Sequence, residues 1–442
     1  MLRVNHFIPS ILFTLFILCN IHTPASAQID LHAHLHMKPG MGAMIKGDFN
    51  QAPTADRWSD RFQMRASGKS LAELNAPLKP KLIIMSFYGH PYFAYSLSRD
   101  GLHFDRRENA RNAVEREYQE FKTFIDQHSD HFKIVRNANE ARSIIQSGKT
   151  AIVLSLEGAW GHLESTEDFN KWVNERGLAI VTPVHLTPDE LGGNALMSTI
   201  ISLANSTFDF IASVWQSRGL CLKTFCKSTE GFSPAGVKLV DELMNRKVWI
   251  DFSHANEIEV NSLLPKLEKN NLPLIATHTQ LRDFYPVERG LGNAEINYIR
   301  KHDGIIGLIP SQQMIPAAMK QAHDEALIAH PEEKDAASAA KGLSCISSLN
   351  VFKKTVAYAI ATLGAPERVA LASDINAPLD GLSPACGDVL KLDESMRDLY
   401  LRGYYTYSQW NTLVRFTSPE ENWSDRNLEH FLTLWGRVRN DR

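Results

Sequence analysis

The sequence is poor in cysteine, has no excess of basic residues and, after its first 27 positions, has no apolar run long enough to cross a membrane. Lys and Arg total 47 against 50 Asp and Glu, so neither the electrostatic footprint of a nucleic-acid-binding protein nor a polybasic cluster for anionic lipid is present. No CxxC spacing, internal repeat or low-complexity linker occurs. The chain is 44% hydrophobic and 22% charged, which is typical of a globular protein with a large core. A small polar or zwitterionic ligand fits this composition better than a polyanion.

The N-terminus has the pattern of a secretory signal. Arg3 supplies a positive charge, Ile11 to Cys19 is almost unbroken apolar sequence, and Ala25-Ser26-Ala27 forms a small-residue cleavage site. We expect cleavage near Ala27-Gln28 and a mature chain, residues 28–442, that forms a single barrel domain and is secreted or periplasmic. The apolar stretch is shorter than the about 20 residues that span a bilayer, so we expect no transmembrane helix in the mature chain.

Four cysteines remain after the signal, and an even number in an exported chain favours disulfides over thiol chemistry. Three pairings are open. We favour Cys221 with Cys226 and Cys345 with Cys386, because each pair lies in sequence typical of loops.

Short β-branched and apolar runs alternate with segments of helical periodicity, which predicts βα units around a parallel sheet. The runs are Gln28–His34, Leu82–Phe87, Ala151–Glu157, Ala179–His185, Val248–His254, Leu272–His278, Ile305–Ile309 and Val369–Asp374. The intervening helices are expected at Glu108–Ile125, Thr166–Arg176, Gly236–Asn245, Asn256–Lys269, Ala294–His302 and Val351–Leu363. This pattern predicts a (β/α)8 TIM barrel. We expect the additional run Phe132–Val135 to be peripheral, and three insertions, Lys38–Pro80, Thr187–Phe232 and Pro316–Lys341, to lie near the substrate site.

Polar residues that can bind a metal gather where the predicted strands end. In a strand His32 and His34 point to the same side, so both imidazoles can hold one ion. Later runs end in other candidate ligands, which are Glu157, His185, His254, His278 and Asp374. Barrel strands deliver functional groups at their C-terminal ends, and burying so many ionisable groups is costly unless they are paired or bound to metal. Together they predict a metal site.

Several motifs resemble the membrane (renal) dipeptidase family of the amidohydrolase superfamily. The motifs are Leu154-Ser155-Leu156-Glu157-Gly158, Gly231-Phe232-Ser233-Pro234-Ala235-Gly236, Trp249-Ile250-Asp251-Phe252-Ser253-His254, Ala276-Thr277-His278, Arg289-Gly290-Leu291 and Ala372-Ser373-Asp374. Their order and spacing cover most of the mature chain. The resemblance implies a metal-dependent hydrolase barrel that cleaves small dipeptides.

The resemblance also implies a set of metal ligands. The positions that match are His32, His34, Glu157, His254 and His278, with Glu157 and a hydroxide bridging two zinc ions. His34 departs from the aspartate that the family has there. Imidazole still binds zinc, but replacing an anion with a neutral ligand raises the net charge of the site and leaves the identity of the metal open. Relatives are often dimers, so a homodimer is an open alternative.

Three residues match positions that act on the substrate in the family. Asp374 matches the catalytic aspartate, His185 matches a histidine that contacts the substrate near the scissile bond, and Arg289 matches an arginine that pairs with the terminal carboxylate. We therefore expect a zinc dipeptidase acting on a dipeptide-like small molecule. The residues Thr187-Pro188-Asp189-Glu190 depart from the family, so substrate preference does not transfer. Two alternatives stay open: another amidohydrolase reaction, on an N-acyl amino acid, lactone or cyclic amide, and a non-catalytic binding protein on the same barrel.

Overall fold

The computed structural model describes residues 28–35, 80–88, 106–197, 207–329, 331, 347–375, 377, 379, 381–385, 389–404 and 407–440. Its strands are β1 (Ile29–Ala33), β2 (Leu82–Tyr88), β3 (Phe132–Val135), β4 (Thr150–Glu157), β5 (Leu178–Thr182), β6 (Trp249–Ile250), β7 (Leu274–Thr279), β8 (Gly304–Leu308) and β9 (Val369–Leu371). Each of the eight predicted runs overlaps one of these strands. The additional run is β3, which pairs only with the N-terminal half of β4 and is peripheral as predicted.

The strands are parallel and form two sheets, which two isolated bridges join into a ring. One sheet runs β1-β2-β4-β5-β6, with β3 beside β4, and the other runs β7-β8-β9. A parallel bridge between Asp251 and Ile275 connects β6 to β7, and another between Ala33 and Ile375 connects β1 to the residues after β9. The strand order is that of a (β/α)8 barrel, as predicted, although regular pairing is interrupted at these two joins.

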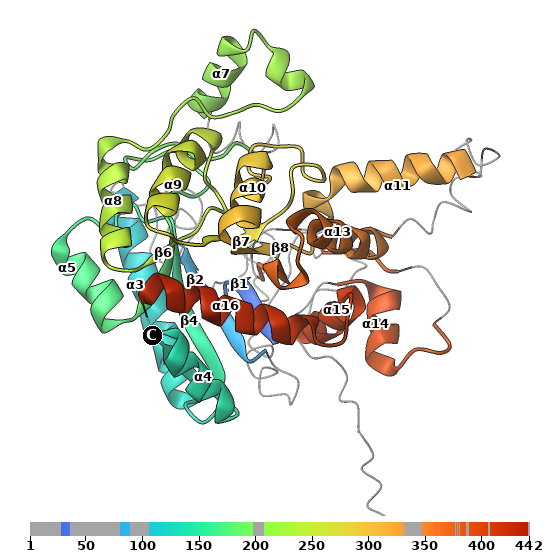
Figure 1. Cartoon of the computed structure of the whole chain (residues 1–442), viewed down its shortest axis with the longest axis horizontal. Helices are drawn as coiled ribbons and strands as arrows, with labels where there is room; N and C mark the ends of the chain where they lie inside the picture. Colours follow the sequence, from blue (N-terminus) through green and yellow to red (C-terminus); the bar gives the residue numbers. More distant parts are fainter. Residues whose placement is uncertain are drawn as a thin grey trace, which may run out of the picture.

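Helices follow most strands and cover the outside of the ring (Figure 1). The α-helices are α3 (Arg106–Gln127), α4 (Ala138–Gln146), α5 (Thr166–Phe169), α7 (Thr207–Gln216), α8 (Pro234–Asn245), α9 (Glu257–Lys269), α10 (Asn293–His302), α11 (Pro316–Ala329), α13 (Ser348–Leu363), α14 (Glu394–Arg402), α15 (Trp410–Thr417) and α16 (Trp423–Arg439). A π-helical segment, η1 (Asn170–Glu175), and 3-10 turns η2 (Leu220–Lys223), η3 (Gln312–Met314), η6 (Pro366–Arg368) and η7 (Tyr407–Gln409) complete the described elements.

Local sequence explains where several helices begin. Ser233 caps α8 with its side chain and Pro234 takes the first helical position, where its missing N–H costs nothing. Asn256 and Glu259 form a reciprocal capping box at the start of α9. These two caps fix the segments on either side of β6, the strand that leads to His254.

Alternate residues along the strands pack into different apolar clusters, as expected for strands buried on both faces. On β2 and β4, Ile83 and Ile152 belong to the cluster that includes α3. Their neighbours Ile84 and Val153 belong to a second cluster that contains the side chains of α16. Glu157 lies four residues after Val153 on β4, so its side chain points to the same side of the strand as that of Val153. That side carries the second cluster and is the interior of the barrel.

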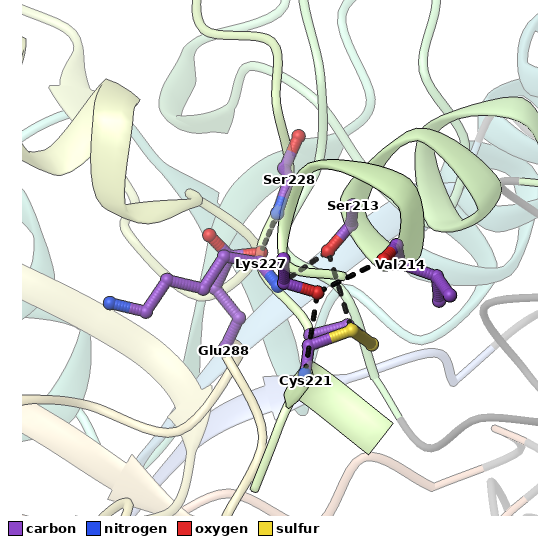
Figure 2. The surroundings of a disulfide bond; sticks show 8 residues. Ser213, Val214, Cys221, Lys227, Ser228 and Glu288 are labelled. Atoms are coloured by element: carbon purple, nitrogen blue, oxygen red, sulfur yellow. Dashed lines mark hydrogen bonds between the residues drawn. A yellow bond between two sulfur atoms is a disulfide. The ribbon is translucent and has the colours of Figure 1, made fainter. Parts of the chain in front are cut away.

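The insertion Thr187–Phe232 contains α7 and a disulfide that the sequence predicted, Cys221–Cys226. Around the disulfide, Ser213 on α7 accepts a hydrogen bond from the backbone N–H of Lys227 at 3.2 Å, and the N–H of Ser228 donates to Glu288 at 2.7 Å (Figure 2). The segment after η2 is therefore tied both to α7 and to the loop after β7. The other predicted pair, Cys345–Cys386, lies outside the described residues.

The insertion Pro316–Lys341 begins with a helix, α11, that the sequence analysis did not predict. The insertion Lys38–Pro80 lies outside the described residues except for Pro80. Among the residues that the structure describes, none of the helices combines the length and the apolar character needed to span a bilayer.

Candidate metal centre

The predicted ligands meet at the C-terminal ends of the strands, although they come from distant parts of the chain. His32 lies in β1, Glu157 is the last residue of β4, and His278 lies in β7. His34, His185, His254 and Asp374 follow the ends of β1, β5, β6 and β9. All seven side chains are buried or nearly so, and the most exposed of them, His185, exposes 11% of its side chain. The structure thus brings every predicted ligand to one place.

A first cluster forms around one oxygen of Glu157. Its Oε2 atom lies 3.6 Å from Nε2 of His32 and 3.3 Å from Nε2 of His34. The Oδ1 atom of Asp374 lies 3.5 Å from His34 Nε2 and 4.0 Å from His32 Nε2. The backbone of Asp374 has a φ of +45°, a conformation that costs energy in most residues but that aspartate tolerates. Two imidazoles and two carboxylates therefore face one small volume.

A second cluster forms around the other oxygen of the same carboxylate. Glu157 Oε1 lies 3.0 Å from Nε2 of His254, 2.9 Å from Nε2 of His278 and 3.3 Å from Nε2 of His185. The next residue, Gly158, has a φ of +84°, a turn that favours glycine directly after the glutamate. Glu157 therefore contributes one oxygen to each cluster, which is the arrangement needed to bridge two cations.

The donor set fits a pair of metal ions better than hydrogen bonding alone. Glu157 Oε1 is buried and makes no hydrogen bond of regular geometry within the described part of the chain. His34 donates from Nδ1 to the carbonyl of Ser86, so an ion that displaces the other ring proton would find Nε2, which lies 3.2 Å from Nε2 of His32. His254 and His278 also approach through Nε2, at 3.0 Å. Imidazole nitrogens and a carboxylate are ligands that zinc accepts.

The charges in the site are strongly coupled. Burial would raise the pKa of Glu157, but the positive charges of His185 and His278 hold it well below its ordinary value. Burial likewise opposes ionisation of Asp374, but the hydrogen bond from His34 and nearby histidine charges lower its pKa. Burial and the charge of Arg289 lower the pKa of His254 to about 3, so this imidazole is neutral. Both carboxylates are therefore ionised and available as ligands or bases at neutral pH.

Arg289 lies within the site and is buried. It exposes 5% of its surface, and its Nη2 atom lies 3.0 Å from Nε2 of His254. Its Nη1 atom contacts the sulfur of Met314 at 3.8 Å, and its Nε atom has no hydrogen-bond partner in the described residues. No carboxylate of those residues forms an ion pair with it. A buried cation without an anion is costly, so the guanidinium is suited to an anionic ligand.

Three residues that were not predicted as part of the site support it. The ring of Tyr88 packs edge-on against His185, with centroids 4.5 Å apart. The Thr277 hydroxyl donates a hydrogen bond to the Asp251 carboxylate and lies 3.0 Å from Nδ1 of His32. Asp251 and Thr277 lie inside the motifs that resemble the dipeptidase family, but nothing in the sequence indicates which residues of those motifs meet in space. Among the described residues, His162 is also buried but belongs to neither cluster.

A large cleft elsewhere is a poor candidate for the active site. A cavity of about 820 Å³ lies against the C-terminal ends of α8, α9 and α16 and includes Lys247, Lys266, Lys269 and Arg437. This is the N-terminal side of the strands, opposite the clusters. Cations here complement the negative ends of three helices, which accounts for their presence without a ligand.

The parallel barrel and the histidine and carboxylate clusters at its strand ends define a metal-dependent hydrolase type of barrel. Residues 199–414 match the family model described as membrane dipeptidase, Peptidase family M19. The resemblance to the membrane dipeptidase family, expected from the sequence motifs, is confirmed, and the match supports an enzyme of the metallodipeptidase class. The matched range contains His254, His278, Arg289 and Asp374 but not His32, His34, Glu157 or His185.

Solved structures share the fold. The probable dipeptidase PvdM from Pseudomonas aeruginosa is 16% identical, with a TM-score of 0.58 over 84% of this chain and 89% of that one. A metallo peptidase from Rhodobacter sphaeroides, liganded with a phosphinate mimic of the dipeptide L-Ala-D-Ala, is 15% identical with the same TM-score, over 94% and 100% of the chains. An amidohydrolase from Pseudomonas aeruginosa is 11% identical, with a TM-score of 0.56 over 94% and 97%.

A curated relative is less informative about activity. An uncharacterized protein in the PQQ-III 3'region of Acinetobacter calcoaceticus is 25% identical over 184 residues, which is 42% of this chain. The matched region spans 50% of the length of that protein.

Proposed function

We propose that the protein is a zinc-dependent dipeptidase that hydrolyses small dipeptides with a free C-terminal carboxylate. The observation that supports this most directly is Glu157, whose two oxygens face two separate sets of histidines. His32 and His34 would hold one ion and His254 and His278 the other, with Glu157 between them. Two bound zinc ions would lower the pKa of a water molecule towards about 7 and polarise the scissile carbonyl.

The protein's own side chains would supply the remaining steps. Asp374 is an ionised, buried carboxylate beside the first cluster, so it can accept the proton of the attacking water and pass it to the leaving amine. His185 lies 3.3 Å from Glu157 Oε1 at the more exposed edge of the second cluster, where it can donate a hydrogen bond to the developing oxyanion.

Arg289 would bind the substrate's C-terminal carboxylate. Its buried guanidinium contacts His254 and forms no ion pair among the described residues. A bound carboxylate would supply the missing anion in a bidentate geometry. N-acyl amino acids carry the same carboxylate, whereas lactones do not, so the arginine favours the first two substrate classes.

A substrate panel tests the proposal. Zinc-loaded protein is assayed with L,L and L,D dipeptides, the same dipeptides as C-terminal amides, N-acyl amino acids and lactones. We expect dipeptides to be hydrolysed and their amides to be poor substrates. Hydrolysis of lactones without hydrolysis of dipeptides would assign the barrel to another amidohydrolase reaction. Purified protein with neither bound transition metal nor activity on added zinc would point to a binding protein.

Export is part of the proposal. The signal-like segment 1–27 and the Cys221–Cys226 disulfide both fit an oxidising compartment outside the cytosol.

A further inference from the structure

A buried carboxylate behind the metal centre, that of Asp251, is saturated with hydrogen-bond donors. Its Oδ1 atom accepts from the backbone N–H groups of Ser253 at 3.1 Å and Thr277 at 2.9 Å, and from the Ser253 hydroxyl at 2.6 Å. Its Oδ2 atom accepts from the hydroxyls of Thr182 at 2.7 Å and Thr277 at 2.6 Å. Asp251 is therefore an ionised acceptor with no proton to give.

The direction of the Thr277 hydrogen bonds follows from this. A threonine hydroxyl has one proton and two lone pairs, and the proton of Thr277 is committed to Asp251. The same oxygen lies 3.0 Å from Nδ1 of His32 and 3.0 Å from Nδ1 of His278. Both imidazoles must therefore donate from Nδ1, so that in the neutral ring the lone pair lies on Nε2 and faces Glu157.

These two histidines belong to different clusters. His32 Nε2 faces Glu157 Oε2 in the first cluster, at 3.6 Å, and His278 Nε2 faces Glu157 Oε1 in the second, at 2.9 Å. His34 donates from Nδ1 to the carbonyl of Ser86 instead, and Nδ1 of His254 has no hydrogen-bond partner among the described residues. The Thr277 hydroxyl is thus a direct polar link between the two halves of the centre.

We propose that Thr277, held by Asp251, is a positioning residue that sets the tautomer of one histidine in each cluster, so that both ion sites gain or lose affinity together. The inference rests on the proposed function, because it takes the clusters to be ion sites. Hydrogen bonds to the distal nitrogen of a metal-binding histidine fix its tautomer and orientation, and losing them typically weakens metal binding about 10- to 100-fold.

The same geometry argues against a third ion. His32, Asp251 and His278 are close enough to hold a metal by distance alone. However, the Thr277 hydroxyl is within hydrogen-bond distance of all three, and it satisfies the Nδ1 atoms and Oδ2 that an ion would need. His32, Asp251 and His278 are therefore joined through Thr277 by hydrogen bonds and do not form an ion site of their own.

Packing holds Thr277 in place. A Cβ atom on Gly307 of β8 would lie 2.0 Å from the Thr277 carbonyl oxygen, so the two backbones approach as closely as glycine permits. The Thr277 N–H is fixed by Asp251, and the residue is fully buried. Replacing its hydroxyl with a methyl group should therefore change the hydrogen bonds with little change in shape.

Metal binding to three variants tests the inference. Thr277→Val removes the hydroxyl, Thr277→Ser keeps it, and Thr182→Val is the matched control, because Thr182 donates to the same carboxylate without contacting a histidine. Metal-free proteins are checked for folding by circular dichroism and titrated with zinc against a competing chelator. We expect both dissociation constants to rise about 10- to 100-fold in Thr277→Val. Thr277→Ser and Thr182→Val should stay within about threefold of the wild type.

A second readout does not depend on metal. In metal-free protein labelled with ¹⁵N-histidine at pH 8, His32 and His278 should give signals of the Nδ1-protonated tautomer that change in Thr277→Val and persist in Thr277→Ser. Wild-type zinc affinity in Thr277→Val, or weakening at one ion only, would overturn the inference while leaving the proposed function intact.

A wild-type protein that binds no zinc would overturn the proposed function. The tautomer signals alone would then test whether Thr277 positions the two histidines.

Discussion

Removing the metal should destabilise the barrel, and His34→Ala should remove about half of the effect. A ligand that binds only the folded state at 100 times its dissociation constant stabilises that state by about 2.7 kcal/mol, so two independent ions contribute about 5 kcal/mol. At an unfolding entropy of about 2.1 cal/mol/K per residue, a 442-residue chain converts this into a rise in Tm of roughly 6 °C. His34 faces only the first cluster, whereas the second keeps Glu157, His254 and His278.

The measurement is thermal unfolding of metal-free protein at increasing free zinc. The matched control is His162→Ala, because His162 is also a buried histidine but lies in neither cluster. This variant should unfold at a lower temperature than the wild type and still gain the full rise with zinc. The reasoning would be refuted if zinc did not change the Tm of the wild type, or if His34→Ala gained as much as the wild type.

Three further substitutions test the proposed base, the proposed carboxylate-binding residue and one surface ion pair. Asp374→Asn should retain zinc and lose about 10²- to 10⁴-fold in kcat, measured together with metal content, and a wild-type rate would exclude Asp374 as the base. Arg289→Ala should lower kcat/KM for dipeptides by at least about tenfold and leave C-terminal amides nearly unchanged; an equal loss for both would mean that Arg289 does not bind the carboxylate. Asp303→Asn should cost about 1 kcal/mol in urea unfolding at pH 7, after allowance for partial exposure. Burial opposes ionisation of Asp303, but His430, Arg368 and the Gly304 N–H lower its pKa from 3.8 to about 2. Its contribution is therefore present above pH 4 and lost as the pH falls through about 2, and a difference that did not shrink over that range would contradict the assignment.

Hydrophobic runs were sufficient to predict the ring of strands, but not where each strand ends. The sequence predicts a strand over Val248–His254, whereas β6 contains only Trp249 and Ile250. The reason is tertiary: the Asp251 side chain accepts the backbone N–H groups of Ser253 and Thr277 in place of a regular strand ladder. A pattern of apolar residues carries no information about a side chain that replaces a neighbouring strand as hydrogen-bond acceptor.

The candidate site, like the fold, could be predicted from the sequence only in part. Its histidines and carboxylates could be predicted because they follow apolar runs that had to be parallel strands. The burial of Arg289 and the support from Thr277 could not, because each depends on contacts between segments far apart in the chain. Thr277 and His32 are separated by 245 positions and meet only once the ring has formed.

The two joins in the barrel coincide with the two clusters. His34 and Asp374 lie on opposite sides of the join at Ala33 and Ile375. His254 and His278 flank the join at Asp251 and Ile275 in the same way. With an ion held by His254 and His278 in the second cluster, metal coordination would link β6 to β7 across the join at Asp251 and Ile275, where backbone pairing is sparse. Loss of that ion would then loosen the barrel at this join, and the persistence of the folded protein would depend on the free zinc around it.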